Sequence, residues 1–312
     1  TNKSTFLRQY VPFFFHALFT GRRMALTYLR DSVQQAIHGQ SDAPSLTPVS
    51  GGSINQAGKF DLRGSEYFIK WNDSKRYPGM FALESRGLDL LRSTGSVRVP
   101  KVIDHWEEDG MGFLVLEWIE AGKGDSGSWE ELGSRLASLH QVRGKVFGWE
   151  TDNYIGSLDQ LNSCCDTWEE FWATCRIEPQ IKMAFDDGII PDSYLRSANR
   201  IFKKLDSLFP KEPPTLVHGD LWGGNVLFDR SGNGILFDPA VYFGHREMDI
   251  GMMHLFGGFD DRCMDQYLQE SPLEKGWEDR LLLFQLYPML VHLNLFGSGY
   301  ASGVKRILDR YD

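Results

Sequence analysis

The stretch 217-VHGDLWGGNVLFDRSGNGILFDPA-240 contains two short apolar runs, residues 226–228 and 235–237. The residues between them, Asp-Arg-Ser-Gly-Asn-Gly, are rich in the types that form turns and adopt positive φ. The pattern predicts two strands joined as a hairpin. Polar groups just before the first strand and just after the second then lie side by side at one end of it.

Three polar residues occupy these positions. Asp220 and Asn225 precede the first strand, and Asp238 follows the second. Two carboxylates and an amide oxygen in one small volume suit a hard cation such as Mg²⁺. Asp and Asn also cap turns, so a polar loop without metal is the alternative for this segment read alone.

The composition is that of a globular protein, and its 312 residues, 42% of them apolar, are enough for two domains. With 33 basic and 42 acidic residues the net charge is −9, whereas nucleic-acid or anionic-membrane partners normally require a basic surface. We therefore expect neither partner. The four cysteines lack C-x-x-C spacing, which is typical of reduced thiols in a cytoplasmic protein.

The apolar run at residues 11–19 follows Lys3 and Arg8, as the core of a signal peptide would. It contains a proline and a histidine, however, lacks a small-residue cleavage site, and precedes two arginines and an amphipathic helix. No stretch approaches the roughly eighteen apolar residues of a membrane span. We expect a soluble protein without a targeting segment.

Two regions of different character follow one another along the chain. Periodicity predicts helices over residues 22–39 and 79–93 and strands over 46–49, 57–62, 66–71, 102–108 and 111–119. Residues 121–128 are mostly Gly and Ser, as in a linker, and Ser128 with Glu131 predicts a capping box for a helix over 129–142. Further helices are expected over 167–186, 192–208, 247–256 and 279–296, with the opening hairpin as the only strands there. The predicted fold class is α+β with two lobes, residues 1–120 and 121–312.

The spacing in the opening stretch matches the phosphotransfer site of protein kinases. There an Asp accepts the substrate proton, an Asn five positions later holds Mg²⁺, and a second Asp holds Mg²⁺ after a hairpin. Asp220, Asn225 and Asp238 have this order and spacing.

The first region adds independent support. Lys70 lies in an apolar strand and Glu84 on the following helix, and in kinases such a pair holds the α- and β-phosphates of ATP. A lysine that bends toward solvent is the alternative. Gly51, Gly52 and Ser53 lie between the first two strands, where backbone N–H groups can cover phosphates, although they do not match G-x-G-x-x-G. Together these features predict a nucleotide-dependent phosphotransferase.

The substrate of this enzyme is expected to be small. Gly219 stands where a protein kinase has Arg, and residues 238–247 lead almost directly into a helix, without a long activation segment ending in Ala-Pro-Glu. A site without that segment is not built to dock an extended peptide. We therefore expect a small molecule, or a small group that projects from something larger.

From about residue 46 to its end the chain closely resembles the fructosamine (ketosamine) kinases. The motifs that carry the resemblance are His218-Gly-Asp-Leu-Trp-Gly-Gly-Asn225, Phe237-Asp-Pro-Ala240, Tyr242-Phe-Gly-His-Arg-Glu247, and residues 91–100, 253–258 and 280–286. The resemblance implies a fold like the aminoglycoside phosphotransferases and protein kinases, with a β-rich nucleotide-binding lobe and a helical catalytic and substrate-binding lobe. It also implies ATP-dependent phosphorylation of the sugar 3-hydroxyl of a ketosamine, after which the adduct breaks down and frees the amine, which is deglycation.

The resemblance further implies roles by position. Asp220 is the proton acceptor, Asn225 and Asp238 hold Mg²⁺, and Lys70 with Glu84 holds the phosphates. The implied cofactors are ATP and Mg²⁺. The implied partners are glycated amines, either small ketosamines or glycated lysine on proteins, while the oligomeric state stays open, with a monomer favoured.

Two further segments complete this picture. Glu117, Trp118 and Ile119 lie at the expected hinge, where the backbone would hydrogen-bond the adenine. Ser53 occupies the position where several family members have a cysteine linked to redox control, so that control is not implied here.

Some residues near the motif have two interpretations. Trp222 either packs in the core or stacks on the sugar or the amine of the substrate. Asp249 is expected to hold the catalytic loop, the segment around Asp220, through backbone hydrogen bonds, and His218 to be a buried support. The polar and aromatic residues 147–154 either line the cleft or form a surface loop.

Two rival functions stay open at the level of sequence. One is a kinase for another small hydroxylated amine, such as an aminoglycoside or a choline-like compound, which Trp222 and the run 242–247 disfavour. The other is a catalytically dead binding protein on the same fold, although every member of the expected catalytic set is present.

Overall fold

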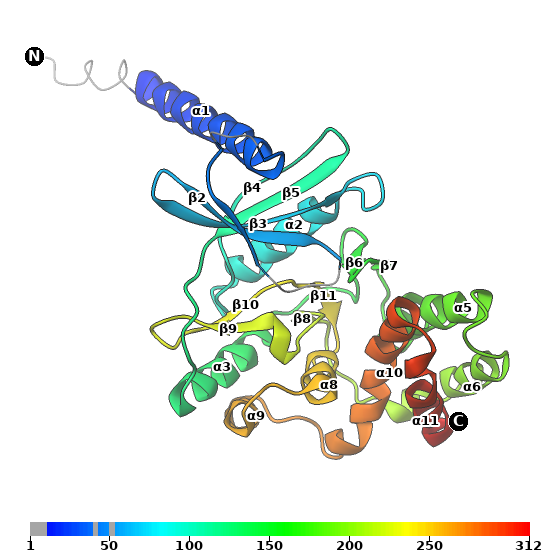
Figure 1. The fold of residues 1–312 in the computed structure, drawn as a ribbon. Helices are drawn as coiled ribbons and strands as arrows, with labels where there is room; N and C mark the ends of the chain where they lie inside the picture. Colours follow the sequence, from blue (N-terminus) through cyan, green and yellow to red (C-terminus); the bar gives the residue numbers. More distant parts are fainter. Residues whose placement is uncertain (1–10, 40–42, 50–53) are drawn as a thin grey trace, which may run out of the picture.

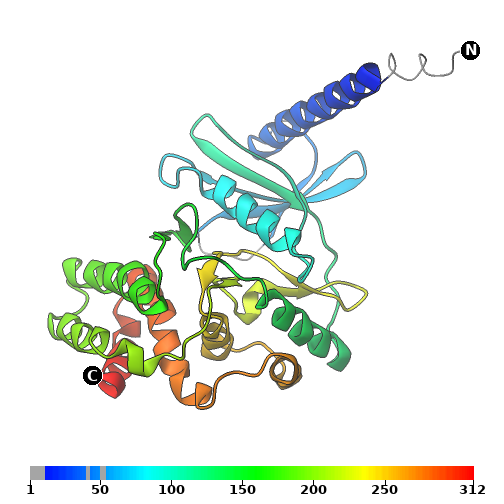
Figure 2. The same cartoon turned by 180° about the vertical axis from the view of Figure 1, so that it is seen from behind.

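The small lobe is a five-stranded antiparallel sheet with one helix on each face (Figures 1 and 2). The computed structural model of the chain describes residues 11–39, 43–49 and 54–312, with side chains from Met24 onward. In spatial order the strands are β1 (Leu46–Pro48), β2 (Gln56–Leu62), β3 (Ser65–Asp73), β5 (Met111–Glu117) and β4 (Val102–Glu108). The helices are α1 (Val11–Ile37) and α2 (Met80–Ser93).

The larger lobe is mainly helical. Its helices are α3 (Ser126–Leu139), α4 (Trp168–Phe171), the π-helix η1 (Trp172–Ile177), α5 (Glu178–Asp186), α6 (Ser193–Phe202), α7 (Leu205–Leu208), the 3₁₀-helix η2 (Gly223–Asn225), α8 (Glu247–Phe256), α9 (Asp261–Glu270), α10 (Trp277–Phe296), the 3₁₀-helix η3 (Ser298–Tyr300) and α11 (Ala301–Tyr311). Its strands form three short antiparallel pairs: β6 (Asn153–Ile155) with β7 (Leu158–Gln160), β8 (Thr215–Val217) with β11 (Tyr242–Gly244), and β9 (Val226–Phe228) with β10 (Gly234–Leu236).

Both faces of the sheet are covered, which explains why its inner strand β5 carries no polar side chain before Glu117. Successive side chains of a strand point to opposite faces. Phe113 and Val115 accordingly pack in the cluster that contains Val33 of α1, whereas Leu114 and Leu116 pack with α2. Lys70 of β3 is paired in register with Leu114. The alternation therefore directs Lys70 toward α2.

The predicted strands of the first region and the opening hairpin are confirmed to within two residues. The capping box is wrong: α3 begins at Ser126, and its N-cap is Asp125, whose carboxylate accepts a hydrogen bond of 2.9 Å from Ser128 N. Asp and Ser are both good N-caps, so the sequence offered two starting points for this helix. The end of the expected linker is thus the first turn of α3.

The expectation that the hairpin supplies the only strands of the larger lobe is wrong as well. The pairs β6–β7 and β8–β11 are three residues long on each side, too short for a periodic signal, and β8 and β11 are distant in sequence. Helices α9 and α11 were not predicted. The expected helix over 167–186 contains the π-helix η1, and that over 192–208 is broken into α6 and α7.

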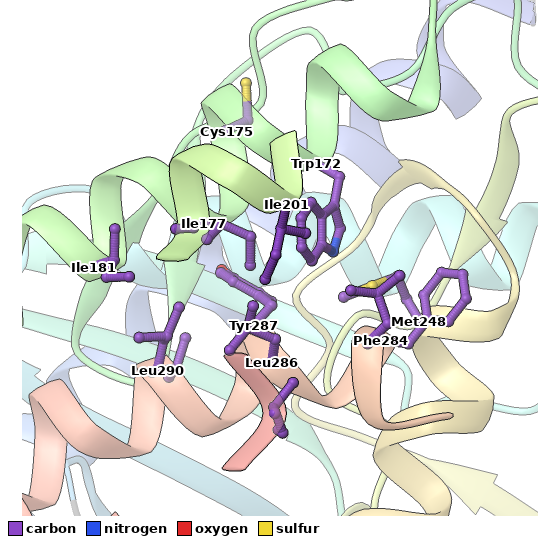
Figure 3. Packing of buried hydrophobic residues seen from close by; sticks show 14 of the residues in the cluster. Trp172, Cys175, Ile177, Ile181, Ile201, Met248, Phe284, Leu286, Tyr287 and Leu290 are labelled. Atoms are coloured by element: carbon purple, nitrogen blue, oxygen red, sulfur yellow. The ribbon is translucent and has the colours of Figure 1, made fainter. Parts of the chain in front are cut away.

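The core of the larger lobe surrounds α10. This helix is apolar on most sides, as expected of a buried helix, and it packs against side chains of η1, α5, α6 and α8 (Figure 3). Trp172, Phe284 and Tyr287 are among its fully or almost fully buried members. In the described part of the chain, no helix combines the length and the apolar character needed to cross a membrane.

Helices α3 and α9 approach closely at Gly133. A Cβ at this position would lie 2.1 Å from the backbone oxygen of Cys263, so no side chain fits. Alanine normally stabilises a helix interior by about 1 kcal/mol relative to glycine. We predict the reverse here: Gly133→Ala should lower the free energy of unfolding by about 1–3 kcal/mol in urea denaturation, because the backbone of α9 must move.

Gly127 in the same helix provides the control. A Cβ there would meet its nearest neighbour, the Asp125 carboxylate, at 3.6 Å, an ordinary contact. Gly127→Ala should therefore change the stability by less than about 0.5 kcal/mol. Equal effects of the two substitutions would show that the contact between α3 and α9 does not restrict residue 133.

Candidate active site

A cavity of about 230 Å³ lies between the two lobes. All five residues predicted to carry the phosphotransfer chemistry line it, namely Lys70, Glu84, Asp220, Asn225 and Asp238. Its other walls come from residues 54–57, α2, the β6–β7 hairpin, the segment after Asp238 and the C-terminal half of α10. The convergence expected from the hairpin is thus present.

Lys70 joins the two lobes at this cavity. Its Nζ lies 2.9 Å from Glu84 Oε1 and also forms an ion pair with Asp238 Oδ1, while only 5% of the residue is exposed. Burial alone would lower the pKa of Lys70, but the charges of Asp238 and Glu84 outweigh it and raise that pKa above its usual value. For the carboxyl group of Glu84, burial has the opposite effect and raises the pKa. The lysine is therefore a fixed cation, and the alternative in which it bends to solvent is wrong.

Asp220 lies on the larger lobe, where Asn225 orients it. The Asn225 amide nitrogen donates to the Asp220 backbone oxygen at 2.8 Å and to its Oδ2 at 3.0 Å. This orientation leaves the amide oxygen of Asn225 for another partner. Burial raises the pKa of Asp220 to about 7, with further contributions from the charges of Asp238 and Asp249.

Asp238 has an unusual backbone. Its φ of 55° is left-handed, a conformation that costs a non-glycine residue about 1–3 kcal/mol and is common at functional sites. Hydrogen bonds on both sides hold it: Phe237 O accepts from His218 Nε2 at 3.1 Å, and Ala240 N donates to His218 O at 2.9 Å. The catalytic loop thus fixes the segment that carries Asp238, and the prediction of His218 as a buried support is confirmed.

Asp249 of α8 holds the loop from the other side, as predicted. Its carboxylate accepts hydrogen bonds from His218 N at 2.7 Å and Gly219 N at 2.9 Å, and it contacts His140 Nε2 at 3.2 Å. Burial would raise the pKa of Asp249, but these hydrogen bonds and the nearby histidine charges outweigh it and lower that pKa. The carboxylate therefore stays charged.

Gly219 is the position where a protein kinase has Arg. Its φ is 85°, and a Cβ would lie 2.0 Å from the backbone oxygen of Ala240. No side chain fits between the catalytic loop and the segment after Asp238. The departure from the protein-kinase sequence therefore has a steric cause.

A buried polar network lies behind the cavity and starts at Arg176 in η1. No part of Arg176 is exposed, and no carboxylate within the described ranges pairs with it. Its guanidinium donates to Asn162 Oδ1 at 2.8 Å and stacks over the ring of Tyr242 at 3.9 Å. A π-helical turn is a frequent feature near functional sites, and here it places a buried cation behind the site.

The network continues to two segments of the cavity wall. Asn153 Oδ1 accepts from Asn162 and Gln160, each at 2.8 Å. Asn153 Nδ2 then donates to Val241 O, and Gln160 Nε2 to Ala240 O, both at 3.0 Å. These bonds fix the β6–β7 hairpin to the segment after Asp238.

Several lining residues were not predicted from the sequence. They include Met80 and Leu83 of α2, Ile155 and Gly156 of the β6–β7 hairpin, and His292, Leu295 and Phe296 of α10. Asn153 and Tyr154 lie at the end of the stretch 147–154, so that stretch lines the cleft only there. The apolar character of α10 suggested core packing alone, and its C-terminal half carried no signal for a site.

Trp222 lines the cavity and is 39% exposed, so it is not the core residue that one interpretation proposed. The hinge residues Glu117, Trp118 and Ile119 do not line this cavity. Glu117 instead exchanges hydrogen bonds with the backbone of Lys101. Gly51, Gly52 and Ser53 lie outside the described residues.

The run 242–247 has a structural role. Glu212, His245 and Glu247 lie close enough together to hold a metal ion, but Arg246 pairs with Glu212 at 2.8 Å and Arg280 with Glu247 at 2.7 Å. Two arginines already neutralise the two carboxylates. None of the residues 242–247 is among those that line the cavity.

The fold and the site together define a phosphotransferase of the protein-kinase-like class. An aminoglycoside phosphotransferase in a ternary complex with AMP-PNP and hygromycin B has a TM-score of 0.59 at 18% identity, and the match covers 89% of this chain and 98% of that one. At this identity the likeness shows the fold alone.

The chain belongs to the fructosamine kinase family, whose model matches residues 27–311. A probable ketoamine kinase of Enterococcus faecium is 41% identical over 271 residues, which cover 85% of this chain and 95% of that protein. The chloroplastic protein-ribulosamine 3-kinase of Arabidopsis thaliana is 36% identical over 290 residues, covering 90% and 87%. A Thermobifida fusca crystal structure assigned as a fructosamine-3-kinase has a TM-score of 0.78 at 33% identity, covering 86% and 93%. The protein is a kinase.

The contact between Lys70 and Glu84 predicts that these residues act as a unit. Lys70→Ala and Glu84→Ala should each lower kcat by about 10²–10³, the effect of losing one preorganised charge contact. The double variant should lose little more than either single one, because groups that act together are not additive. Steady-state turnover of the three variants checks this. Losses that multiply in the double variant would mean that the two side chains act separately.

Proposed function

We propose that the protein transfers the γ-phosphoryl group of ATP to the sugar 3-hydroxyl of a ketosamine. The observation that carries the proposal is the meeting of the pair Lys70–Glu84 with Asp220, Asn225 and Asp238 in one cavity between the lobes. The family and the names of the relatives support the acceptor class. In this proposal residues 1–120 form the nucleotide-binding lobe and residues 121–312 the catalytic and substrate-binding lobe.

On the nucleotide side, Lys70 holds the α- and β-phosphates, and Glu84 keeps its ammonium group in place. Gly51, Gly52 and Ser53 precede β2 and cover the phosphates with backbone N–H groups. The backbone of residues 117–119 receives the adenine at the end of β5. The charge of Lys70 is suited to this role, because two carboxylates keep it protonated at any physiological pH.

The donor set fits Mg²⁺. A carboxylate and an amide oxygen are the ligand types that this cation prefers, and both Asn225 and Asp238 line the cavity. The side chain of Asp238 is 38% exposed, and the amide oxygen of Asn225 is turned away from Asp220. Asn225 and Asp238 would hold the cation, which neutralises charge on the phosphates during transfer.

Asp220 receives the proton of the acceptor hydroxyl. As the hydroxyl oxygen bonds to the γ-phosphorus, the bond from that phosphorus to the bridging oxygen of ADP breaks, and ADP leaves. Asn225 fixes the Asp220 carboxylate through the 3.0 Å hydrogen bond to Oδ2. Trp222 and His292 line the same cavity and would contact the acceptor.

The product, a ketosamine 3-phosphate, breaks down and frees the amine, so the proposed role is deglycation and protein repair. The acceptors are glycated amines, either small or on protein lysines, and the proposal needs neither a nucleic acid nor a membrane. The four cysteines are free thiols, which supports a reducing compartment such as the cytoplasm. The proposal takes the protein to act as a monomer.

Steady-state ATP consumption with fructosyl-, ribulosyl- and erythrulosyl-amines side by side tests the function. Turnover of at least one of them above aminoglycoside and choline controls supports it. Turnover of only those controls would overturn it.

Asp220→Asn tests the general base. Asparagine keeps the shape but cannot accept the proton as a carboxylate does, so kcat should fall by about 10²–10⁴. ATP affinity measured by calorimetry should be nearly unchanged, because Asp220 is not assigned to the nucleotide. A variant that keeps most of its kcat, or that also loses ATP binding, would assign Asp220 a structural or metal-holding role.

Asp238→Asn tests the metal site. Asparagine tolerates the left-handed backbone of residue 238, so the fold should be kept. Turnover should fall by about 10²–10³, because one charged ligand is lost, and the dependence of ATP binding on Mg²⁺ should weaken. Wild-type turnover with Mg²⁺ and ATP would contradict the assignment, and an unchanged thermal midpoint is the control for folding.

A further inference from the structure

Exposed aromatic side chains gather beside the cavity. In the described part of the chain seven large hydrophobic residues are exposed, and three of them, Trp222, Phe256 and Phe296, belong to one group at this place. Trp222 and Phe296 line the cavity, and the ring of Phe256 lies 6.2 Å from that of Trp222. Exposed aromatics concentrated next to a cavity mark a surface that contacts a ligand.

These rings form one continuous surface, which we call the aromatic rim: Trp222, Phe256, His292, Phe296 and Tyr300. The ring of His292 lies 4.5 Å from Phe256, 5.4 Å from Phe296 and 5.3 Å from Tyr300. His292 lines the cavity, whereas Phe256 and Tyr300 lie outside its lining. The rim thus leads from the interior of the site to the surface.

The rim is uncharged and its inner members are fixed. Trp222 rests on Gly224, where a Cβ would lie 2.1 Å from the indole ring. His292 Nδ1 donates to Pro288 O at 2.8 Å, and burial lowers the pKa of His292, so the ring is neutral at neutral pH. The charged residues of the cavity lining are the phosphotransfer residues Lys70, Glu84, Asp220 and Asp238.

We propose that the aromatic rim binds the amine substituent of the ketosamine and selects amines that carry a hydrocarbon chain or ring. This inference rests on the proposed function. The preferred acceptors are then ketosamines of alkyl or aromatic amines, including the side chain of glycated lysine. Ketosamines with a carboxylate next to the nitrogen, such as those of free α-amino acids, are poorer acceptors.

The chemistry of the acceptor supports this assignment. The amine of a ketosamine is attached to C1. This carbon is two bonds from C3, which carries the hydroxyl that faces Asp220 in the proposed function. On the protein, Trp222 follows Asp220 by two residues. A cavity of about 230 Å³ must hold the sugar beside the phosphates, so a substituent on the nitrogen has to leave it. At the rim, aromatic faces attract the protonated amine and remove its hydrocarbon from water. Among the described residues that line the cavity the one cation is Lys70, which Glu84 and Asp238 already pair, so a carboxylate on the substituent gains no partner there.

The experiment compares adducts of one sugar, the best acceptor among the three tested, with methylamine, benzylamine and glycine. In the wild-type protein, kcat/KM should be roughly tenfold higher for the benzylamine adduct than for the methylamine adduct, because the rim buries the benzyl ring. The glycine adduct should have the lowest kcat/KM of the three. In Phe256→Ala and in Phe296→Ala the benzylamine-to-methylamine ratio should fall by about threefold or more. Each ratio comes from one variant, so a general loss of activity cancels.

Phe185→Ala is the matched control, because Phe185 on α5 is 38% exposed, like Phe256, and does not line the cavity. It should leave the ratio unchanged. Equal kcat/KM for all adducts in the wild type, or an unchanged ratio in both rim variants, would overturn the role of the rim and leave the proposed function intact. A wild-type protein that phosphorylates none of the adducts would overturn the proposed function, and the inference with it.

Discussion

The site depends on one buried ammonium group that two lobes share. Lys70 comes from the sheet, Glu84 from the helix beneath it, and Asp238 from the larger lobe, so a single cation connects three elements. Only 5% of the lysine is exposed, and its removal would leave the largely buried carboxylate of Glu84 without a counter-charge. The relative position of the small lobe and the segment that carries Asp238 is therefore constrained by electrostatics as well as by packing.

The parts of this arrangement that follow from short-range rules could be predicted from the sequence. Alternation along β3 places Lys70 on the α2 side, and turn chemistry joins the strands that precede Asp238. Asp249 was predicted to hold the catalytic loop, and its carboxylate does accept two backbone amides there. In each case the residue type and its spacing favour the observed geometry.

The parts that depend on long-range contacts could not be predicted. Arg176 resembles any surface arginine in the sequence, and only the packing of η1 shows that it is buried among aromatic rings. The strands β8 and β11 pair across a wide sequence separation over three residues each. Phe296 belongs to an apolar helix, and the point where α10 leaves the core decides that its ring is exposed rather than buried.

The closeness of Gly219 to Ala240 has a consequence for regulation. In protein kinases, phosphorylation of the activation loop controls activity. Here an arginine at residue 219 would collide with the backbone 2.0 Å away, so a single substitution cannot introduce the side chain that a protein kinase has at this position. Asp249 instead holds the catalytic loop through the backbone amides of His218 and Gly219. Control that acts through an arginine at this position of a protein kinase therefore has no counterpart at residue 219.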